Sequence, residues 1–565
     1  SNMKCLLTRS KENIRVLKKL LILVVFSIFI DYSLTYAGEI ENQSTKENIL
    51  EATNALDRDE YLAAVIKYRK AAESSNDIEL AKISSKLAYS YGLNREGLVS
   101  TKLWLKLEKD SEQALIYLSK FSIRQEKYSL ARRYISQILK KDPETAGKKL
   151  LSMTSILSEG SVNNIYNMIF DLAKKYPKSA DAHAAVATMA LKNNNANEAK
   201  RRSKLAMEIS PGWIQPKLIY ARSLLLDGDS EAAIDYVARI IGDEPRPDPE
   251  TRLELAILFL REGRSDDAMS QVNQILLEYS SQPEALRLMG IINFSLNYLD
   301  LAREDFQDLL ATGFYKKDAI YYLARIADLN SDFALATALY MRVTSGSNAI
   351  ISQRRASQLL LDNKKPTAAL ILLRDFGKNY PAFAIQMIKA RAEVNEIQGN
   401  YIEALRLYDD FIHFRPDDES TLLSSSELLL KMGRLKEAVA RYRDAVSKFP
   451  DSPASLNALG YTLADKTNSF RQAEKLIKKA LKYDPNNPAI LDSYGWVLYK
   501  RGKLEKALSQ LHLAYNGYRD PEIASHLVEV LWKLGKTEEA KQLLEEAELE
   551  NPLHPLLQNI REKIL

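Results

Sequence analysis

The chain has 565 residues, of which 46% are hydrophobic and 27% are charged, and it contains only 18 prolines and 20 glycines. This composition is ordinary for a folded protein and excludes extensive disordered regions. The formal net charge of +5 comes from 79 basic and 74 acidic residues, so its distribution along the chain decides whether an anionic partner is implied.

The first 37 residues have the pattern of a signal peptide for export. Six basic residues precede an apolar run at 20–30, and a polar stretch then ends in Thr35, Tyr36 and Ala37. This apolar run is shorter than the ~20 residues that a membrane-spanning helix needs. We therefore expect a signal peptide at 1–37 and a short linker at 38–47. Retention of residues 1–37 as a membrane anchor is the alternative.

Removal of residues 1–37 would leave 73 basic and 72 acidic residues, an almost neutral chain. The charge therefore predicts no nucleic-acid partner. The only cysteine, Cys5, lies before the apolar run, where it would be lost with the signal. The mature chain is thus expected to contain neither disulfides nor a cysteine for lipid attachment, which suits the periplasm.

A small residue returns about every 34 positions along the rest of the chain. A period of 34 in purely helical segments is the signature of the tetratricopeptide repeat, in which two antiparallel helices bury their apolar faces by stacking on neighbouring units. The pattern predicts an all-α fold, a right-handed α-solenoid of about fifteen helix-turn-helix repeats over 48–552, with a capping helix at 553–565. The recurring residues are Ala64, Ala131, Ala199, Ala233, Ala268, Ala302, Ala336, Ala369, Ala404, Ala438, Ala473, Ala507 and Ala540, with Gly97 and Ile165 in the two remaining steps.

Prolines recur in one phase of this period and mark the ends of second helices, because proline cannot continue a helix. Residues 76–110 and 145–176 fit the repeat less well, the latter with Ile165 in the small position. The segment 242–250 has three prolines and four acidic residues, so we expect an exposed loop and a local hinge there. The phased prolines are Pro143, Pro177, Pro211, Pro245, Pro381, Pro416, Pro450, Pro485 and Pro552.

The clearest repeats lie near the C-terminus, where small residues recur at two positions of each unit. These positions are predicted to lie where the two helices cross, and a bulky side chain there would push the backbones apart. We interpret them as structural rather than functional. They are Gly460, Ala473, Gly495, Ala507 and Ala540.

Other positions of each first helix are predicted to point into a concave groove, where they are free to vary with a bound partner. Aromatic residues among hydrogen-bonding groups often dominate interface energies. The predicted partner-binding residues are Asn457, Tyr461, Asp492, Trp496, Tyr499, Lys500, Glu529, Trp532 and Lys533, with Glu427, Lys431 and Asp465 on the same face.

The alternative for these aromatic residues is packing between repeats, since tryptophan is seldom fully exposed. A ring that lines the groove could be removed with little change in melting temperature, and we expect this of Trp496→Ala. A fall like that expected for Ala507→Leu would make the ring part of the core. The groove lacks the Lys and Asn pair that clamps a terminal carboxylate in chaperone-binding repeats.

The sequence contains no recognisable catalytic or cofactor motif. Its histidines are scattered over different repeats without metal-binding spacing, and no phosphate-binding loop or nucleophile elbow occurs. The repeats leave no segment of ~100 residues for a separate catalytic domain. We therefore expect no catalytic residues, no metal and no cofactor. The histidines are His183, His413, His512, His526 and His554.

The C-terminal repeats resemble one family more specifically. The stretches from Leu456 to Asp465, Asp484 to Tyr499 and Asp520 to Trp532 are similar to the end of proteobacterial exported repeat proteins that bind a carboxy-terminal processing protease. The similarity covers about a hundred residues, from Pro453 to Pro552. It implies a periplasmic or outer-membrane adaptor that recruits the serine protease and presents cell-wall hydrolases to it.

The resemblance implies protein partners, namely the protease and the hydrolases, and export to the periplasm with association with the outer membrane. The family's best-known member is a lipoprotein, whereas this chain has no cysteine after its apolar run. A scaffold for envelope polysaccharide export or outer-membrane assembly is the alternative of the same class, and a repeat-bearing transferase or hydrolase is the alternative from another. Oligomeric state does not follow from the sequence.

Overall fold

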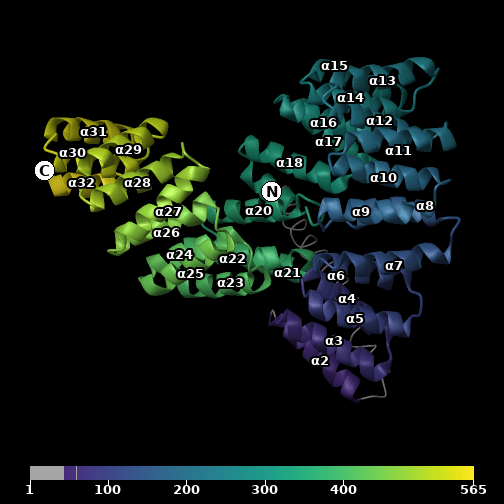
Figure 1. The fold of residues 1–565 in the computed structure, drawn as a ribbon, viewed down its shortest axis with the longest axis horizontal. Coiled ribbons are helices and arrows are strands. Elements are labelled where there is room, and N and C mark those ends of the chain that lie inside the picture. Colours follow the sequence, from purple (N-terminus) through teal and green to yellow (C-terminus); the bar gives the residue numbers. More distant parts are fainter. Residues whose placement is uncertain (1–42, 59, 565) are drawn as a thin grey trace, which may run out of the picture. The chain divides into compact units, whose positions relative to one another are not determined.

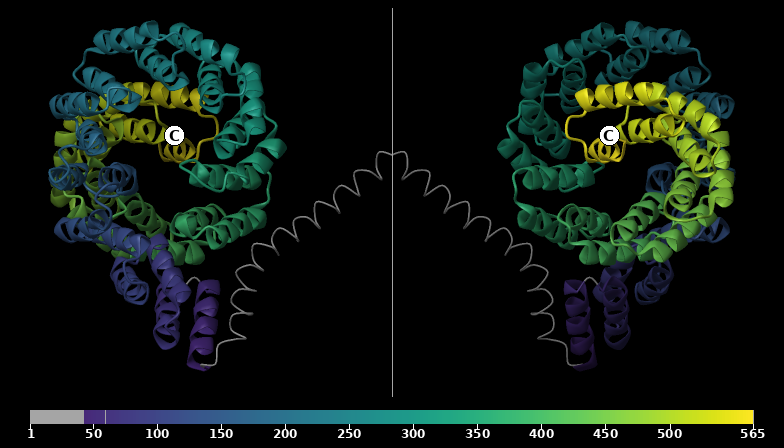
Figure 2. Two further views of the ribbon diagram at one scale, coloured as in Figure 1. Left: turned by 90° about the vertical axis from the view of Figure 1, so that its right-hand side faces the viewer. Right: turned by 90° about the vertical axis from the view of Figure 1, so that its left-hand side faces the viewer.

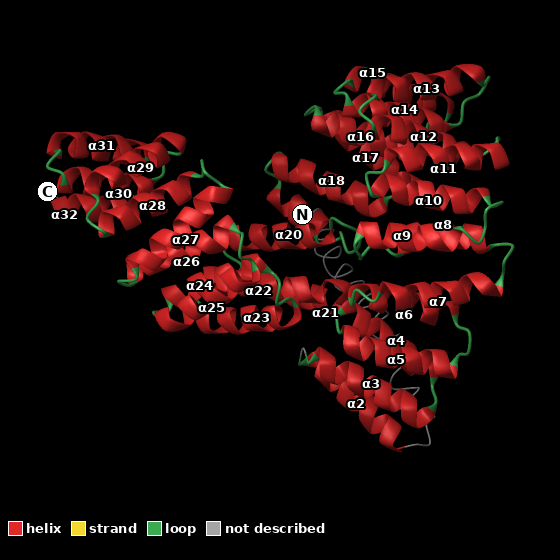
Figure 3. Cartoon of the chain, in the orientation of Figure 1, coloured by secondary structure: helices red, strands yellow, loops and turns green. Residues whose placement is uncertain are grey.

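The computed structural model describes residues 43–58 and 60–564, and the predicted signal peptide at 1–37 lies outside them. The described residues contain α-helices and one 3₁₀ helix, with no strand (Figure 3). Thirty α-helices, α2 to α31, follow one another in this part of the chain, two for each repeat period, and α32 comes after them. The predicted all-α tetratricopeptide solenoid is confirmed.

The helix bounds follow the repeat period, and the helices are labelled in Figure 1. They are α2 (Gln43–Asp57), α3 (Tyr61–Ser75), α4 (Ile78–Ser90), α5 (Asn94–Leu107), α6 (Glu112–Arg124), α7 (Tyr128–Lys141), α8 (Ala146–Ile156), α9 (Val162–Ala173), α10 (Ala180–Lys192), α11 (Ala196–Ile209), α12 (Ile214–Leu226), α13 (Ser230–Asp243), α14 (Pro249–Arg261), α15 (Ser265–Glu278), α16 (Pro283–Ser295), α17 (Leu299–Thr312), α18 (Lys316–Leu329), α19 (Phe333–Tyr340), α20 (Ala349–Asp362), α21 (Pro366–Asn379), η1 (Pro381–Phe383), α22 (Ala384–Ile397), α23 (Tyr401–Phe414), α24 (Glu419–Lys431), α25 (Leu435–Lys448), α26 (Pro453–Lys466), α27 (Phe470–Tyr483), α28 (Pro488–Lys500), α29 (Leu504–Gly517), α30 (Pro521–Lys533), α31 (Thr537–Glu550) and α32 (Pro555–Ile564).

The chain forms two compact units. One contains residues 43–364 and 375–384, and the other contains residues 365–374 and 385–564. Within each unit, consecutive helices lie beside one another (Figure 2). The expected loop at 242–250 lies between α13 and α14, and Asp248 caps α14 by accepting a hydrogen bond from the Glu250 backbone N–H at 2.8 Å. The division between the units lies near α21 and not at this loop.

The start of the repeat array differs from the expected boundary. We expected a linker at 38–47, but α2 begins at Gln43, so residues 43–47 are helical. Thr45 is fully buried, and its hydroxyl lies 2.7 Å from that of Ser74 at the end of α3. This contact joins the first turn of α2 to the end of α3.

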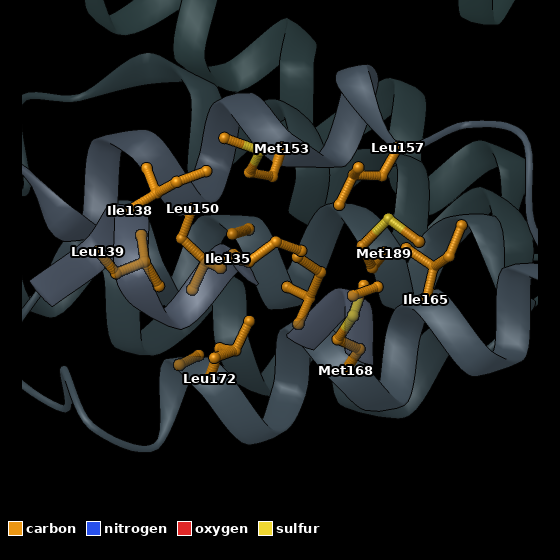
Figure 4. Packing of buried hydrophobic residues seen from close by; sticks show 14 of the residues in the cluster. Ile135, Ile138, Leu139, Leu150, Met153, Leu157, Ile165, Met168, Leu172 and Met189 are labelled. Atoms are coloured by element: carbon orange, nitrogen blue, oxygen red, sulfur yellow. The ribbon is translucent and has the colours of Figure 1, made fainter. Parts of the chain in front are cut away.

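The poorly matching stretch at 145–176 still forms a helix pair, α8 and α9, around larger side chains. Ile165, in the position of the recurring small residue, is 2% exposed. Leu150 and Met153 of α8 pack with Ile165 and Met168 of α9 in one buried cluster (Figure 4). Flexible methionine side chains fill the irregular space that a larger crossing residue creates.

The repeat beginning at α18 has an unusually short second helix. Its small residue, Ala336, is fully buried, but α19 ends at Tyr340 and turns follow at 341–348. The fully buried Gln353 of α20 donates hydrogen bonds to the carbonyls of Tyr340 at 3.2 Å and Val343 at 3.0 Å. Gln353 thus satisfies carbonyl groups that the missing helical turn would have paired.

The predicted crossing positions of the C-terminal repeats lie between tightly packed helices. Ala473, Ala507 and Ala540 are fully buried. A Cβ atom on Gly495 would lie 2.5 Å from Leu511 Cγ, and one on Gly460 would lie 2.6 Å from Ile477 Cγ1. The helix pairs therefore approach too closely for larger side chains at these positions.

We expect Ala507→Leu to lower the free energy of unfolding by about 1–3 kcal/mol, because three added carbon atoms must enter a filled helix crossing. Urea denaturation followed by circular dichroism measures this change. Ala440→Leu on the exposed side of α25 is the matched control and should change stability by less than ~0.5 kcal/mol. Equal effects of the two substitutions would contradict the packing argument.

Candidate functional site

The candidate site lies on one face of α26, α28 and α30, the first helices of three consecutive repeats. Each of these helices begins with proline after a capping side chain, supplied by Ser452, Asn487 and Asp520. This arrangement starts each helix in the same register, because the cap satisfies free backbone N–H groups and proline needs none. Residues at equivalent positions of the three helices therefore lie on the same side of the array.

The centre of the site is a buried ion pair beneath an aromatic ring. His526 Nδ1 lies 2.9 Å from Asp492 Oδ1, and the two residues are 7% and 5% exposed. The Trp496 ring stacks on the His526 ring with centroids 4.1 Å apart and planes 19° apart. Trp496 is itself 6% exposed and donates from Nε1 to Asp465 Oδ1 at 3.1 Å. These contacts join α26, α28 and α30.

Two opposing effects act on the pKa of His526. Burial lowers it, because an imidazolium loses its hydration. The hydrogen bond and charge of Asp492 act in the other direction, helped by the carboxylates of Glu522 and Asp465, and the net result is a raised pKa. The protein environment thus favours the charged form of His526.

Two tyrosines extend the site outward from this centre. The hydroxyl of Tyr461 donates to Glu522 Oε1 at 2.7 Å, and that of Tyr499 donates to Glu529 Oε1 at 2.8 Å. Burial, and then the hydrogen bond to Glu529, raise the pKa of Tyr499 to about 12, so its hydroxyl stays protonated and remains a donor. Lys563 of α32 also pairs with Glu529.

The exposed side of the site carries lysine side chains. Lys500 Nζ lies 4.6 Å from the centre of the Trp496 ring, within the range of a cation–π interaction. Lys500 and Lys533 are both exposed, at the ends of α28 and α30. The site therefore presents ammonium groups and aromatic edges above a fixed network of carboxylates.

The structure joins some of the predicted groove residues and separates others. Tyr461, Asp492, Trp496, Tyr499, Lys500 and Glu529 belong to this connected network. Trp532 packs, half-buried, against the core of the last repeats. Asn457 is also half-buried, and its Oδ1 accepts no hydrogen bond from the described residues. Lys431 pairs with Glu396 and Glu427 at the other end of this unit.

The burial of Trp496 and Asp492 corrects part of the prediction. We expected the Trp496 ring to line the groove so freely that its loss would leave the melting temperature nearly unchanged. The structure instead places it between repeats, stacked and hydrogen-bonded, so its loss must affect stability. The reason is the packing of α30 against α28, which covers the ring with His526.

Helical spacing along the sequence did not point to three residues of the network, His526, Glu522 and Lys563. In the sequence, His526 is one of five histidines scattered over different repeats. It lies 34 residues after Asp492, which is one repeat period, and this spacing could have indicated the contact. Glu522 occupies the second position of α30, which is a groove position of the repeat.

The described residues contain no group of three or more His, Cys, Asp or Glu side chains that could hold a metal ion. Among the helices of 43–58 and 60–564, none has both the length and the apolar character required to span a bilayer. The polar groups of the site satisfy one another, and what they offer outward is charge and aromatic surface. Such a surface suits recognition of a protein segment.

Comparisons with known proteins agree with the repeat assignment. Profiles described as tetratricopeptide repeat match residues 224–292, 425–468, 462–521 and 521–546. TPR repeat-containing protein PA4667 of Pseudomonas aeruginosa is 35% identical over 213 residues, which cover 38% of this chain and 36% of that protein. Protein CTR9 homolog of Arabidopsis thaliana is 21% identical over 379 residues, 62% of this chain and 34% of that protein.

The chain thus spans about a third of the length of these two curated relatives. Among solved structures, the crystal structure of the APC/C hetero-tetramer Cut9-Hcn1 aligns over 95% of this chain and 99% of that chain. The sequence identity is 13% and the TM-score is 0.35, too low to add to the fold assignment.

Proposed function

We propose that this chain, a tetratricopeptide repeat protein, is a non-catalytic scaffold that recruits a carboxy-terminal processing protease and presents cell-wall hydrolases to it. We further propose that it acts in the periplasm, in association with the outer membrane. The repeats support the general role, because stacked helix pairs provide an extended surface for protein partners. The similarity of Pro453 to Pro552 to protease adaptors suggests the particular partner.

The observation that carries the proposal is the connected network of α26, α28 and α30. Its buried part, from Asp465 through Trp496 and His526 to Asp492, fixes the positions of the exposed groups. A rigid surface loses little conformational entropy when it binds a partner. Lys500 and Lys533 then offer charge-assisted hydrogen bonds to carboxylates or carbonyls of the bound protein.

Affinity purification of the exported chain from envelope extract tests this proposal. We expect a serine protease and its cell-wall hydrolase substrates to be recovered together. The variant Lys500→Glu/Lys533→Glu should recover about tenfold less protease or still less, because two interface charges are reversed. Arg443→Glu, on the exposed side of α25, is the control and should recover as much protease as the unchanged chain.

Three results would overturn the proposal. Recovery of a polysaccharide polymerisation or secretin complex in place of the protease would favour the alternative scaffold. Protease recovery that does not respond to the Lys500→Glu/Lys533→Glu change would remove the site from the interaction. Hydrolase cleavage by the purified chain alone would contradict a non-catalytic role.

A further inference from the structure

The second helices of the last three repeats, α27, α29 and α31, expose side chains at the same six register positions. The register is counted from the buried alanine of each helix, which is Ala473, Ala507 or Ala540. The six positions lie one and two residues before this alanine, and two, five, six and nine residues after it. Every side chain at these positions is exposed. Residues three and four apart lie on the same side of a helix, so the positions form one stripe on each helix.

The three stripes form one surface, because the helices belong to consecutive repeats of the same unit. At the start of α29, Lys503 Nζ lies 3.6 Å from Glu474 Oε2 of α27. After the end of α29, Arg519 Nη1 lies 2.9 Å from Glu550 Oε1 of α31. We call this the α27–α29–α31 surface. It lies on the second helices, whereas the candidate site lies on the first helices of these repeats.

Charge changes sign across the α27–α29–α31 surface. The stripe of α27 has five cations and no carboxylate, that of α29 has one of each sign, and that of α31 has four carboxylates and no cation. The residues are Arg471, Gln472, Lys475, Lys478, Lys479 and Lys482 on α27; Glu505, Lys506, Ser509, His512, Leu513 and Asn516 on α29; and Glu538, Glu539, Gln542, Glu545, Glu546 and Leu549 on α31.

The positive stripe is unfavourable for the isolated chain. The first turn of α27 holds Arg471 and no acidic residue, although the partial positive charge at a helix N-terminus favours acidic side chains. The one carboxylate of α27, Glu474, is buried and pairs with Arg501 and, at 2.9 Å, with Lys478 of the stripe. Lys479 Nζ lies 3.2 Å from Asp451 Oδ1. Partial desolvation lowers the pKa of Lys503, and its neighbours Arg501, Lys478 and Lys506 lower it further. Two of the five cations thus have a carboxylate partner within the chain, and the stripe still keeps an excess of positive charge.

We propose that the α27–α29–α31 surface joins two copies of this chain in a dimer whose two-fold axis runs parallel to α29. Rotation about this axis brings α27 of one copy against α31 of the other, and the reverse contact forms by symmetry. Residues at equal register then face each other. Arg471 meets Glu538 of the partner subunit, and Lys478 meets Glu545 of the partner subunit.

The charge pattern favours this arrangement over other partners. A two-fold axis perpendicular to α29 within the same plane would place α27 against a second α27, and like charges would repel. An acidic protein or an anionic membrane would attract α27, but α31 would repel it from the same surface. The nearly neutral α29, with Leu513 exposed, lies on the axis where each helix meets its own copy.

Sedimentation of the full chain under low and high salt tests this proposal. We expect a dimer whose dissociation constant rises with salt, because the Debye length falls from about 10 Å at 0.1 M to about 3 Å at 1 M. Arg471→Glu and Glu538→Arg should each weaken the dimer about tenfold or more, since each change creates two repulsive contacts. Together the two changes restore opposite charges, so the double variant should dimerise again.

The matched control is Arg443→Glu, which occupies the register of Lys478 one repeat earlier on α25 and should leave the dimer intact. A chain that stays monomeric, or a dimer indifferent to either single reversal, would overturn the proposal. Failure of the double variant to dimerise, or salt-sensitive growth into long filaments, would exclude the closed two-fold contact. Binding of phosphatidylglycerol vesicles by a monomer, lost in Arg471→Glu and kept in Glu538→Arg, would assign the surface to a membrane instead. Protease recovery in the affinity purification does not depend on this result.

Discussion

Trp496→Ala is expected to lower the free energy of unfolding by about 3–5 kcal/mol, the usual cost of removing a large buried aromatic side chain. The ring is 6% exposed, stacks on His526 and donates a hydrogen bond to Asp465. Its removal leaves a cavity and an unpaired Asp465 oxygen. Thermal melting by circular dichroism measures the loss, and hydrogen exchange should localise it to α26, α28 and α30.

Two further tryptophan variants separate the contributions in this prediction. Trp496→Phe keeps an aromatic ring on His526 and loses the hydrogen bond, so it should cost less, about 1–2 kcal/mol. Trp532→Ala removes a half-buried ring and should also cost less than Trp496→Ala. An unchanged melting temperature in Trp496→Ala would show that the ring lies free in the groove.

Asp492→Asn is expected to destabilise the chain most strongly in mildly acidic solution. The substitution leaves the protonated form of His526 buried without its carboxylate partner, which costs about 3–5 kcal/mol. Above the folded-state pKa of His526, the imidazole is neutral in both proteins, so the difference between them should shrink. Denaturation curves from about pH 5.5 to pH 9 measure this difference, because the ordinary pKa of histidine is about 6.5.

The sign of the pH effect follows from the raised pKa of His526. Its contribution to stability is complete below the unfolded-state pKa and is lost as the pH rises through the folded-state pKa. The control Asp444→Asn removes an exposed pairing with Lys448 and should cost ~0.3–0.5 kcal/mol. An Asp492→Asn deficit that stays constant over this pH range would show that His526 is neutral in the folded protein.

Trp496→Ala and Asp492→Asn also test how the buried network supports partner binding. Both substitutions act on groups that join three repeats, so each should weaken partner binding through the arrangement of α28 and α30. Lys500→Glu/Lys533→Glu changes exposed side chains and should weaken binding with little loss of stability. Comparison of these variants distinguishes the supporting groups from those that meet the partner.

Much of the fold could be predicted because each repeat obeys the same local constraints. The period of 34 located Ala473, Ala507 and Ala540 in helix crossings, where they are fully buried. It could not show that α19 stops at Tyr340 or that α2 starts at Gln43, because these boundaries depend on contacts such as those of Gln353 and Thr45. The division near α21 is equally a property of packing between repeats.

The sequence predicted which residues of the candidate site share a helix face, but not which of them are buried. Helical spacing places Tyr461, Trp496 and Tyr499 on equivalent faces of neighbouring helices, and the structure has all three in one connected network. The spacing did not reveal that His526 covers Trp496, since the distance between stacked helices depends on side chains from several repeats. It also treated the aromatic residues as one class, although Trp496 is buried and Trp532 is only half-buried.

The amino-acid sequence by itself determined the helical repeat, its fifteen units and the residues on each helix face, because these depend on spacing along a single chain. Only the tertiary structure decided which of those residues are buried and which are paired. The Asp492–His526 ion pair beneath Trp496 arises from the packing of one repeat on the next. Burial and pairing are properties of that contact, and the period does not encode them.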